Sequence, residues 1–215
     1  MPRTVQPREF HPSSNLSPRS PVKLRLHRKL GPRLTGSLAD CLRDLPQLTG
    51  NPIRIRFEPE LTNHRGKLLS RQPGRGCAVY AASFIRKREV VLETELLNRP
   101  RLLRLIVIHE LFHFVWTRLG NKARNQFAGL LADEYRQGVR GELGESAGVK
   151  KSLLDLRDCP ASSKRWRDYV CESFCDTAAW RYSRTKQKGA FSLGVRWRKR
   201  REAWFKAEFA DCSKC

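Results

Sequence analysis

The apolar run at residues 102–116 constrains this chain most, because polar side chains interrupt it at a helical spacing. His109, Glu110 and His113 form the motif HExxH within the pentapeptide HELFH. In a helix, residues four apart lie one above the other, so the two histidines can hold one Zn²⁺ while Glu110 holds a water against it. A buried helix has little other use for these groups, since each unpaired polar group costs about 1–3 kcal/mol. The run therefore predicts a buried helix that binds metal at the centre of the fold.

Composition indicates a single folded domain. The 215 residues are enough for one sizeable core, and 40% of them are apolar. We expect a flexible basic arm over residues 1–34, where repeated prolines break any long helix, and one domain over residues 35–215 with a basic carboxyl-terminal segment. The amino terminus lacks the apolar segment of a secretory signal, and no apolar run is long enough to span a bilayer. These features predict a cytoplasmic protein without a membrane span.

Periodicity predicts an α+β fold in which a small antiparallel sheet packs on the motif helix and further helices. Alternating residues predict a strand at 53–57, and the β-prone runs 77–85 and 89–93 predict an antiparallel hairpin. Apolar spacing and capping residues predict helices at 37–45, 98–120, 122–137 and 162–182. The stretch 138–159 is polar and poorly periodic, so we expect a loop there with at most one short helix.

The histidine pair needs a third protein ligand, because a catalytic zinc usually takes three and leaves one position for water. No histidine follows the motif, which makes a downstream carboxylate the natural ligand. Glu172 is favoured, because Asp176 lies one turn later and can accept the free ring N–H of a ligating histidine. Asp133 and Glu134 remain the alternative, although neither has a carboxylate four positions later.

The cysteines are seven in number and irregularly spaced, which suits reduced thiols better than a disulfide framework. Cys171 and Cys175 are one helical turn apart, and Cys212 and Cys215 form a CxxC. Together they could form a four-thiolate zinc site, but buried free thiols are common and we do not favour it.

HExxH followed by the turn from Glu172 to Asp176 resembles the gluzincin metallopeptidases, which combine HExxH with a downstream ExxxD helix. The resemblance covers about a third of the chain, including loosely the predicted hairpin. It implies a zincin-like fold in which residues 77–84 bind the substrate in extended form. The spacing departs from that of thermolysin-like members, which keep the motifs roughly 20 residues apart. In this chain Glu172 lies 59 positions after His113.

The resemblance implies a zinc metalloendopeptidase that hydrolyses a protein or peptide substrate. A zinc-activated water would attack the peptide bond, with Glu110 as the general base. A donor must also stabilise the developing oxyanion, and Tyr80, Tyr169 and Tyr182 are the candidates.

The charge distribution supports an alternative, a nucleic-acid-binding protein with a structural or degenerate metal site. The net charge is +22, and most of it lies in residues 1–35 and 181–206. Basic and aromatic residues interleave in residues 194–206 and could pair with phosphates and stack on bases. An amphipathic helix that packs Trp197, Trp204 and Phe205 on the core explains the same pattern, and we favour it.

Overall fold

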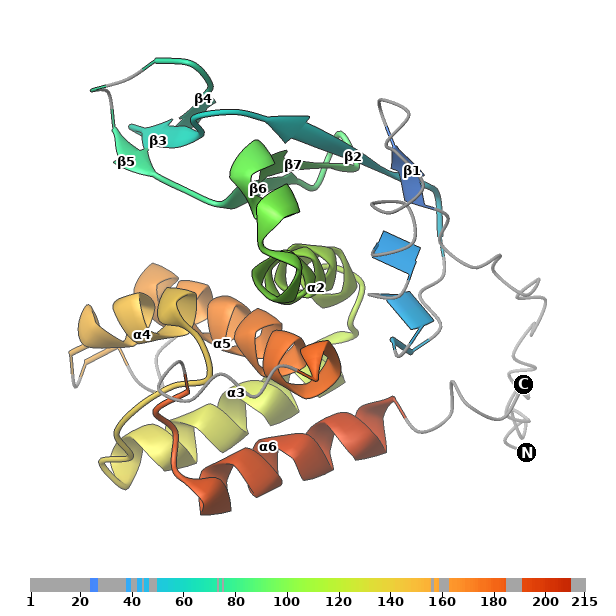
Figure 1. Ribbon diagram of the computed structural model, residues 1–215. Coiled ribbons are helices and arrows are strands. Elements are labelled where there is room, and N and C mark those ends of the chain that lie inside the picture. The colour runs from blue at the N-terminus through green and yellow to red at the C-terminus, as the bar shows by residue number, and fades with distance from the viewer. Residues whose placement is uncertain are drawn as a thin grey trace, which may run out of the picture.

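A computed structural model shows an α+β fold with sheets on one side and helices on the other (Figure 1). It describes residues 24–26, 38–39, 42–43, 45–46, 50–72, 74, 76–155, 157–158, 163–184 and 191–209. The α+β class is as predicted. Of the predicted basic arm, only residues 24–26 are described, and they form a strand. The rest of the arm lies outside the described residues, as do Cys212 and Cys215.

The main sheet is mixed, and not antiparallel as predicted. Within the described residues its strand order is β1 (Leu24–Leu26), β2 (Ile53–Glu58), β7 (Glu89–Glu93) and β6 (Ala81–Phe84). The first three run parallel, and β6 runs antiparallel to β7 at the edge, as the predicted hairpin requires. The prediction was wrong for β2 and β7, because after an excursion beyond β2 the chain returns as β6, antiparallel to β2, and the hairpin then reverses it into β7 beside β2. That excursion forms a second sheet from β3 (Thr62–His64), β4 (Lys67–Leu69) and β5 (Cys77–Ala78).

The motif helix α2 (Pro100–Trp116) lies between the main sheet and the remaining helices (Figure 1). Pro100 occupies its first turn, where the missing N–H costs no intrahelical hydrogen bond. One side of α2 packs in a core cluster shared with the sheet, through Leu103, Val107, Leu111 and Phe114. The other side places Ile108 and Phe112 in a cluster shared with the helices. The helix is apolar on nearly every side because both of its sides are buried.

The remaining helices build a layer on the far side of α2. They are α3 (Asn121–Arg136), α4 (Glu145–Ser152), α5 (Lys164–Ser183) and α6 (Val195–Glu208), and the 3₁₀ helix η1 (Thr94–Asn98) precedes α2. The central helix α5 packs against α2, α3, α4 and α6. It begins where predicted, because the side chain of Ser163 accepts a hydrogen bond from the Trp166 N–H. The short helix α4 lies in the stretch predicted to be mostly loop.

Two of the three aromatic residues of α6, Trp204 and Phe205, pack on the core. Phe205 is fully buried, and Trp204 packs against Phe127 and Phe174. The guanidiniums of Arg196 and Arg200 lie over the ring of Trp197. The favoured packing of this helix on the core is therefore confirmed for Trp204 and Phe205, whereas Trp197 is not part of the core cluster.

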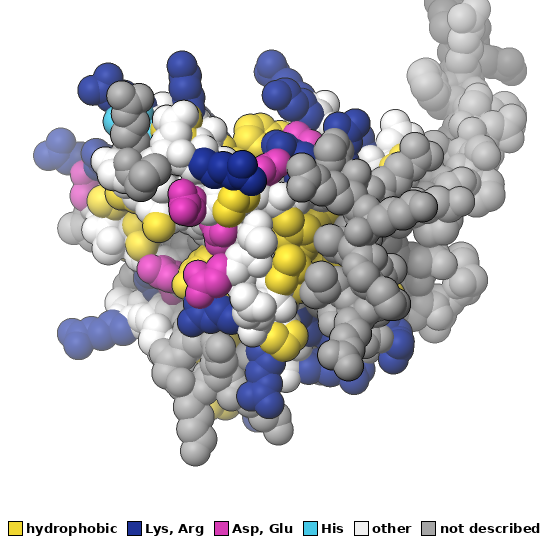
Figure 2. Space-filling view, turned by 45° about the horizontal axis from the view of Figure 1, so that its top comes forward, with side chains coloured by type: hydrophobic (Ala, Val, Ile, Leu, Met, Phe, Trp, Pro, Cys, Tyr) yellow, Lys and Arg dark blue, Asp and Glu magenta, His cyan; other side chains and the backbone are white. Residues whose placement is uncertain are grey.

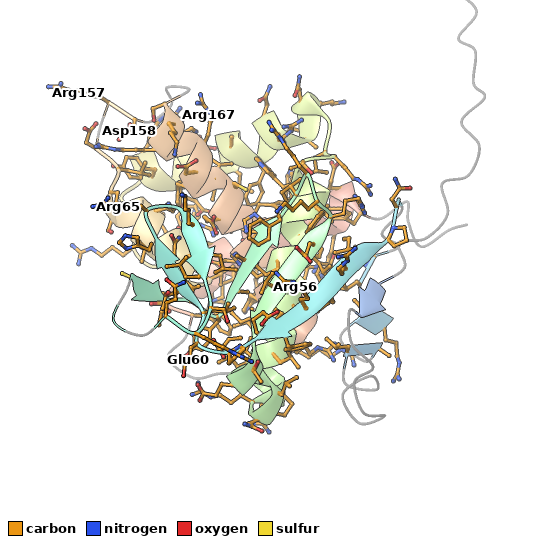
Figure 3. The ribbon with its side chains drawn as sticks, turned by 90° about the horizontal axis from the view of Figure 1, so that it is seen from above. Arg56, Glu60, Arg65, Arg157, Asp158 and Arg167 are labelled. Carbon is orange, nitrogen blue, oxygen red and sulfur yellow. The ribbon has the colours of Figure 1, made fainter. Side chains whose placement is uncertain are left out.

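Basic residues also lie at the margin of the molecule. Seen from above, Arg157, Asp158 and Arg167 gather near the amino end of α5, far from Arg56 on β2 (Figure 3). Among the residues that the structure describes, no helix is both long and apolar enough to cross a membrane.

Candidate metal centre

A cavity of about 860 Å³ lies between β6 and the helices α2, α4 and α5. One side of β6 faces the cavity, because β6 is the edge strand of the main sheet. Asp and Glu side chains gather near the middle of one face of the molecule, with Lys and Arg around them (Figure 2). The acids that line the cavity are Glu110, Glu145, Glu172 and Asp176. A basic protein therefore has an acidic cavity.

Three donor atoms converge in this cavity: His109 Nε2, His113 Nε2 and Glu172 Oε2. The two nitrogens are 3.2 Å apart, and Glu172 Oε2 lies 3.3 Å from His109 Nε2 and 3.9 Å from His113 Nε2. Zinc bonds of about 2.0–2.2 Å in a tetrahedral site separate neighbouring donors by about 3.4 Å. The donor set and its spacing therefore fit one Zn²⁺.

Asp176 fixes the orientation of His109. Its Oδ1 lies 2.7 Å from His109 Nδ1, and because a carboxylate only accepts, Nδ1 carries the proton. In the neutral ring, the lone pair of Nε2 is then directed toward the other two donors. Asp176 Oδ2 accepts a hydrogen bond of 2.8 Å from the Ala147 N–H in the first turn of α4. Asp176 thus links the start of α4 to a histidine of the site.

Gly144, just before α4, lets the carboxylate of Asp176 approach the first turn of this helix. A Cβ at position 144 would collide with the carboxylate of Asp176. The backbone there is extended, a conformation open to any residue. Glycine is needed at this position because a side chain has no room. No sequence pattern identified this residue.

His113 has a different partner at its second ring nitrogen. Its Nδ1 lies 3.6 Å from Cys171 Sγ on α5. A hydrogen bond with Cys175, together with the nearby His113, lowers the pKa of the Cys171 thiol to about 6. Burial raises the pKa of Cys175 well above its usual range. Cys171 therefore lies at the Nδ1 atom of His113, just as Asp176 lies at the Nδ1 atom of His109.

The electrostatics of the three donors favour a positive charge among them. Burial alone lowers the pKa of His109, but hydrogen bonds to Asp176 and Glu172 outweigh it and hold that pKa well above the usual range. Burial raises the pKa of the Glu172 carboxyl, but the hydrogen bond to His109 and the charge of His113 produce a net decrease. A metal cation at the centre of the three donors would be stabilised for the same reason, because the surrounding carboxylates favour positive charge there.

Glu110 lies beside the three donors without being one of them. The Ser83 hydroxyl on β6 donates to Glu110 Oε2 at 2.5 Å, and Ser83 Oγ is also 3.1 Å from the Glu110 carbonyl oxygen. The edge strand thereby holds the carboxylate in the cavity. Sequence reasoning missed Ser83, because nothing in the pattern of residues 77–85 distinguishes it.

The rival carboxylates lie elsewhere. Glu134 is fully buried in an ion pair with Arg201, 2.6 Å between Oε2 and Nη2. Asp133 pairs with Arg200 and Arg136 near the surface. Neither lines the cavity, so the structure brings only the favoured Glu172 to the histidines.

The three candidate oxyanion donors are also separated. Tyr169 is buried and donates to Glu142 at 2.6 Å. Tyr182 stacks on Phe112, with ring centroids 5.5 Å apart. Of the three, only Tyr80 lines the cavity.

Comparison of the chain with protein-family models, with curated proteins and with solved structures found no match. Its function therefore has to be inferred from the residues of the site.

Proposed function

We propose that this protein is a zinc metalloendopeptidase of gluzincin type with a zincin-like fold. One observation carries the proposal: His109, His113 and Glu172 direct three donor atoms to one point, with Glu110 beside them in the same cavity. HExxH supplies two ligands and the base, and α5 supplies the third ligand with its partner Asp176. Two histidines and a glutamate form a known type of catalytic zinc site.

The chemistry follows from the placement of each group. Zn²⁺ held by the three donors would lower the pKa of a water to roughly 7 and polarise the scissile carbonyl. Glu110 takes the proton from the attacking water and delivers it to the leaving amine. Its Oε2 is occupied by Ser83, which leaves Oε1 for the water. Tyr80, in the wall of the cavity, offers a hydroxyl to the developing oxyanion.

The edge strand β6 gives the substrate a place to bind. Its open side borders the cavity, so an extended peptide can add to it through main-chain hydrogen bonds. The peptide then lies between β6 and the helices α4 and α5, with its backbone near Glu110. This placement suits an endopeptidase, because both ends of an added strand can continue past the site.

The test combines metal analysis with mapping of new protein termini in a cell lysate. We expect about one zinc ion per chain. Glu110→Gln should keep that zinc while the rate of cleavage falls by about 10²–10⁴-fold, because the general base is lost. Glu145→Gln removes another acid of the cavity, one that is exposed and not among the three donors, and should cleave like the parent. Folded protein that takes up no zinc, or a Glu110→Gln protein that still cleaves at the parent rate, would contradict the proposal.

The structure lends no further support to nucleic-acid binding by residues 194–206. Stacking on bases needs exposed rings, whereas Trp204 and Phe205 pack in the core and the ring of Trp197 already lies under the guanidiniums of Arg196 and Arg200. The peptidase is therefore the one function that we propose.

A further inference from the structure

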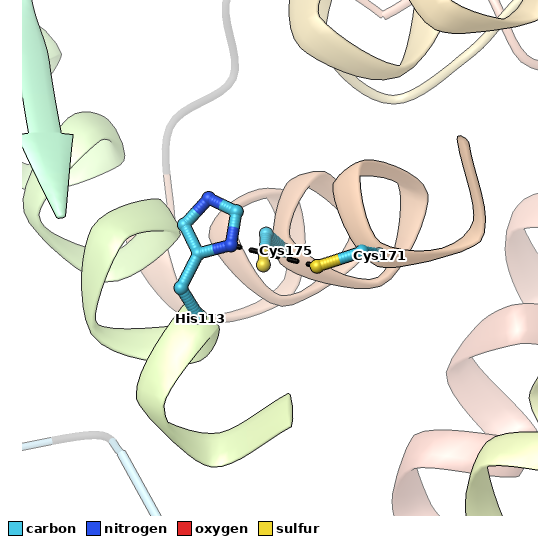
Figure 4. A group of neighbouring side chains, drawn as sticks. All are labelled: His113, Cys171 and Cys175. Carbon is cyan, nitrogen blue, oxygen red and sulfur yellow. Dashed lines mark hydrogen bonds between the residues drawn. The ribbon is translucent and has the colours of Figure 1, made fainter. Parts of the chain in front are cut away.

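Three soft donors meet on the opposite side of His113 from the catalytic cavity. Figure 4 shows His113 of α2 facing Cys171 and Cys175 of α5. His113 Nδ1 and the two sulfur atoms all lie within 4.8 Å of one another, and Nδ1 is 3.6 Å from Cys171 Sγ. Zinc bonds of about 2.3 Å to sulfur and 2.0–2.1 Å to nitrogen place tetrahedral ligands about 3.6 Å apart. The distance from Nδ1 to Cys171 Sγ therefore matches that of two ligands to one ion, and Cys175 Sγ lies within 4.8 Å of both.

The thiols are better placed to chelate an ion than to form a disulfide. Residues four apart on a helix have Cβ atoms about 5–6 Å apart, whereas a disulfide needs about 3.5–4.5 Å. A bond between Cys171 and Cys175 would therefore require α5 to bend. A metal ion bridges the larger separation without any change in the helix.

Burial and donor type define which ion fits. Cys175 is fully buried, whereas Cys171 and His113 are partly exposed, so an ion can enter from one side and rest against the core. Two sulfurs and one imidazole select soft cations over Mg²⁺ or Ca²⁺. We propose that His113 Nδ1, Cys171 and Cys175 form a second metal site, which binds one thiophilic cation such as Cd²⁺ or Cu⁺.

This second site competes with the first for His113. A neutral imidazole has one lone pair, because its other nitrogen carries a proton. Nε2 faces His109 and Glu172, whereas Nδ1 faces the thiols, so the neutral ring ligates at one side at a time. A thiophilic cation bound to the thiols therefore withdraws His113 from the first site and inhibits the enzyme. This inhibition rests on the proposed peptidase function, but the second site does not.

The site is tested by titrating the full-length protein with Cd²⁺ and following sulfur-to-cadmium charge-transfer absorption. Cys212 and Cys215 are replaced by serine in every sample, so that the CxxC does not contribute. We expect the absorption to saturate at about one Cd²⁺ per chain, and Cys171→Ser or Cys175→Ser to weaken binding by about 100-fold or more. Cys77→Ser, at an exposed position on β5, is the matched control and should titrate like the parent.

Glu172→Ala separates the two sites. It removes a donor of the first site but none of the second, so cadmium absorption should persist while zinc binding to the first site is lost. Loss of the cadmium absorption in Glu172→Ala would assign the thiols to the first site and overturn the proposal. An unchanged titration in Cys171→Ser would overturn it as well. Failure of the first site alone would leave this cadmium result intact, so the two proposals can fail separately.

A measurement without core substitutions covers the case in which Cys175→Ser does not fold. Cd²⁺ should protect Cys171 from alkylation by iodoacetamide at least about tenfold, while exposed Cys77 stays reactive. Equal alkylation of Cys171 with and without Cd²⁺ would contradict the proposal.

Discussion

At the residue scale, a serine hydroxyl on β6 sets the direction of Glu110, the proposed general base. Ser83 occupies Glu110 Oε2 at 2.5 Å, so Oε1 is the oxygen left to face a water. Glu110 is itself buried, which limits the water that could otherwise hold its carboxylate. A base that is held in one direction loses less freedom when the reaction begins.

Ser83→Ala should lower kcat by roughly 10–100-fold without loss of zinc. A hydrogen bond to a charged group contributes about 1.5–3 kcal/mol, and about 1.4 kcal/mol changes a rate tenfold. Zinc content should stay constant, because Ser83 is not one of the three donors. Steady-state kinetics on a mapped peptide, with Ser152→Ala at an exposed position of α4 as control, measures the effect. An unchanged kcat in fully loaded Ser83→Ala would show that Ser83 does not position the base.

At the scale of elements, the short helix α4 supports the site through its first turn. The Ala147 N–H donates to Asp176, whose other oxygen accepts from His109. The amino end of a helix also favours a negative charge. One turn of α4 and one turn of α5 together fix the tautomer of His109, the proposed metal ligand.

Gly144→Ala should weaken zinc binding by about 10–100-fold, the usual cost of losing a group that orients a ligand. The added Cβ meets the carboxylate of Asp176, which must then move away from His109. Competition with a chromophoric chelator measures the affinity.

Gly148→Ala is the matched control in the same helix, because a Cβ there meets no heavy atom within 4 Å. It should leave the zinc affinity unchanged and raise the free energy of unfolding by about 0.5–1 kcal/mol, since alanine favours a helix over glycine. If Gly144→Ala binds zinc as tightly as Gly148→Ala, Asp176 is not needed to orient His109.

At the scale of the whole molecule, one buried arginine joins α6 to the rest of the helical layer. Arg201 donates to Glu134 at 2.6 Å, to Glu142 at 2.7 Å and to Ser173 at 2.9 Å. Burial raises the pKa of Glu142, but the charge of Arg201 outweighs it and the net shift is downward. Glu142 lies two residues before Gly144, so this network also anchors the segment that leads to the candidate metal centre.

Arg201→Met should destabilise the protein by about 3–5 kcal/mol, because it leaves Glu134 buried without its ion-pair partner and Glu142 with Lys151 as its remaining cation. Arg200→Met is the neighbouring control. Arg200 is 39% exposed and pairs with Asp133, which is 44% exposed, so its loss should cost about 1 kcal/mol or less. Urea unfolding curves measure both. Equal midpoints for the two variants would mean that the Arg201 network contributes little to stability.

The sequence by itself determined the local geometry. The apolar run with HELFH predicted α2, and the spacing from Glu172 to Asp176 placed two carboxylates one turn apart on α5. Both follow from helical periodicity, which decides which side chains share a face. Glu172 was favoured as the third ligand because of that spacing and because no histidine follows the motif.

Only the tertiary structure decided which faces meet. It brought Glu172 to the histidines across 59 positions, turned β2 and β7 parallel, and placed Ser83 against Glu110. It also put Cys171 beside His113, where no motif indicated a contact. Periodicity specifies the face on which a residue lies, whereas the partner of that face depends on how helices and strands pack across the whole chain.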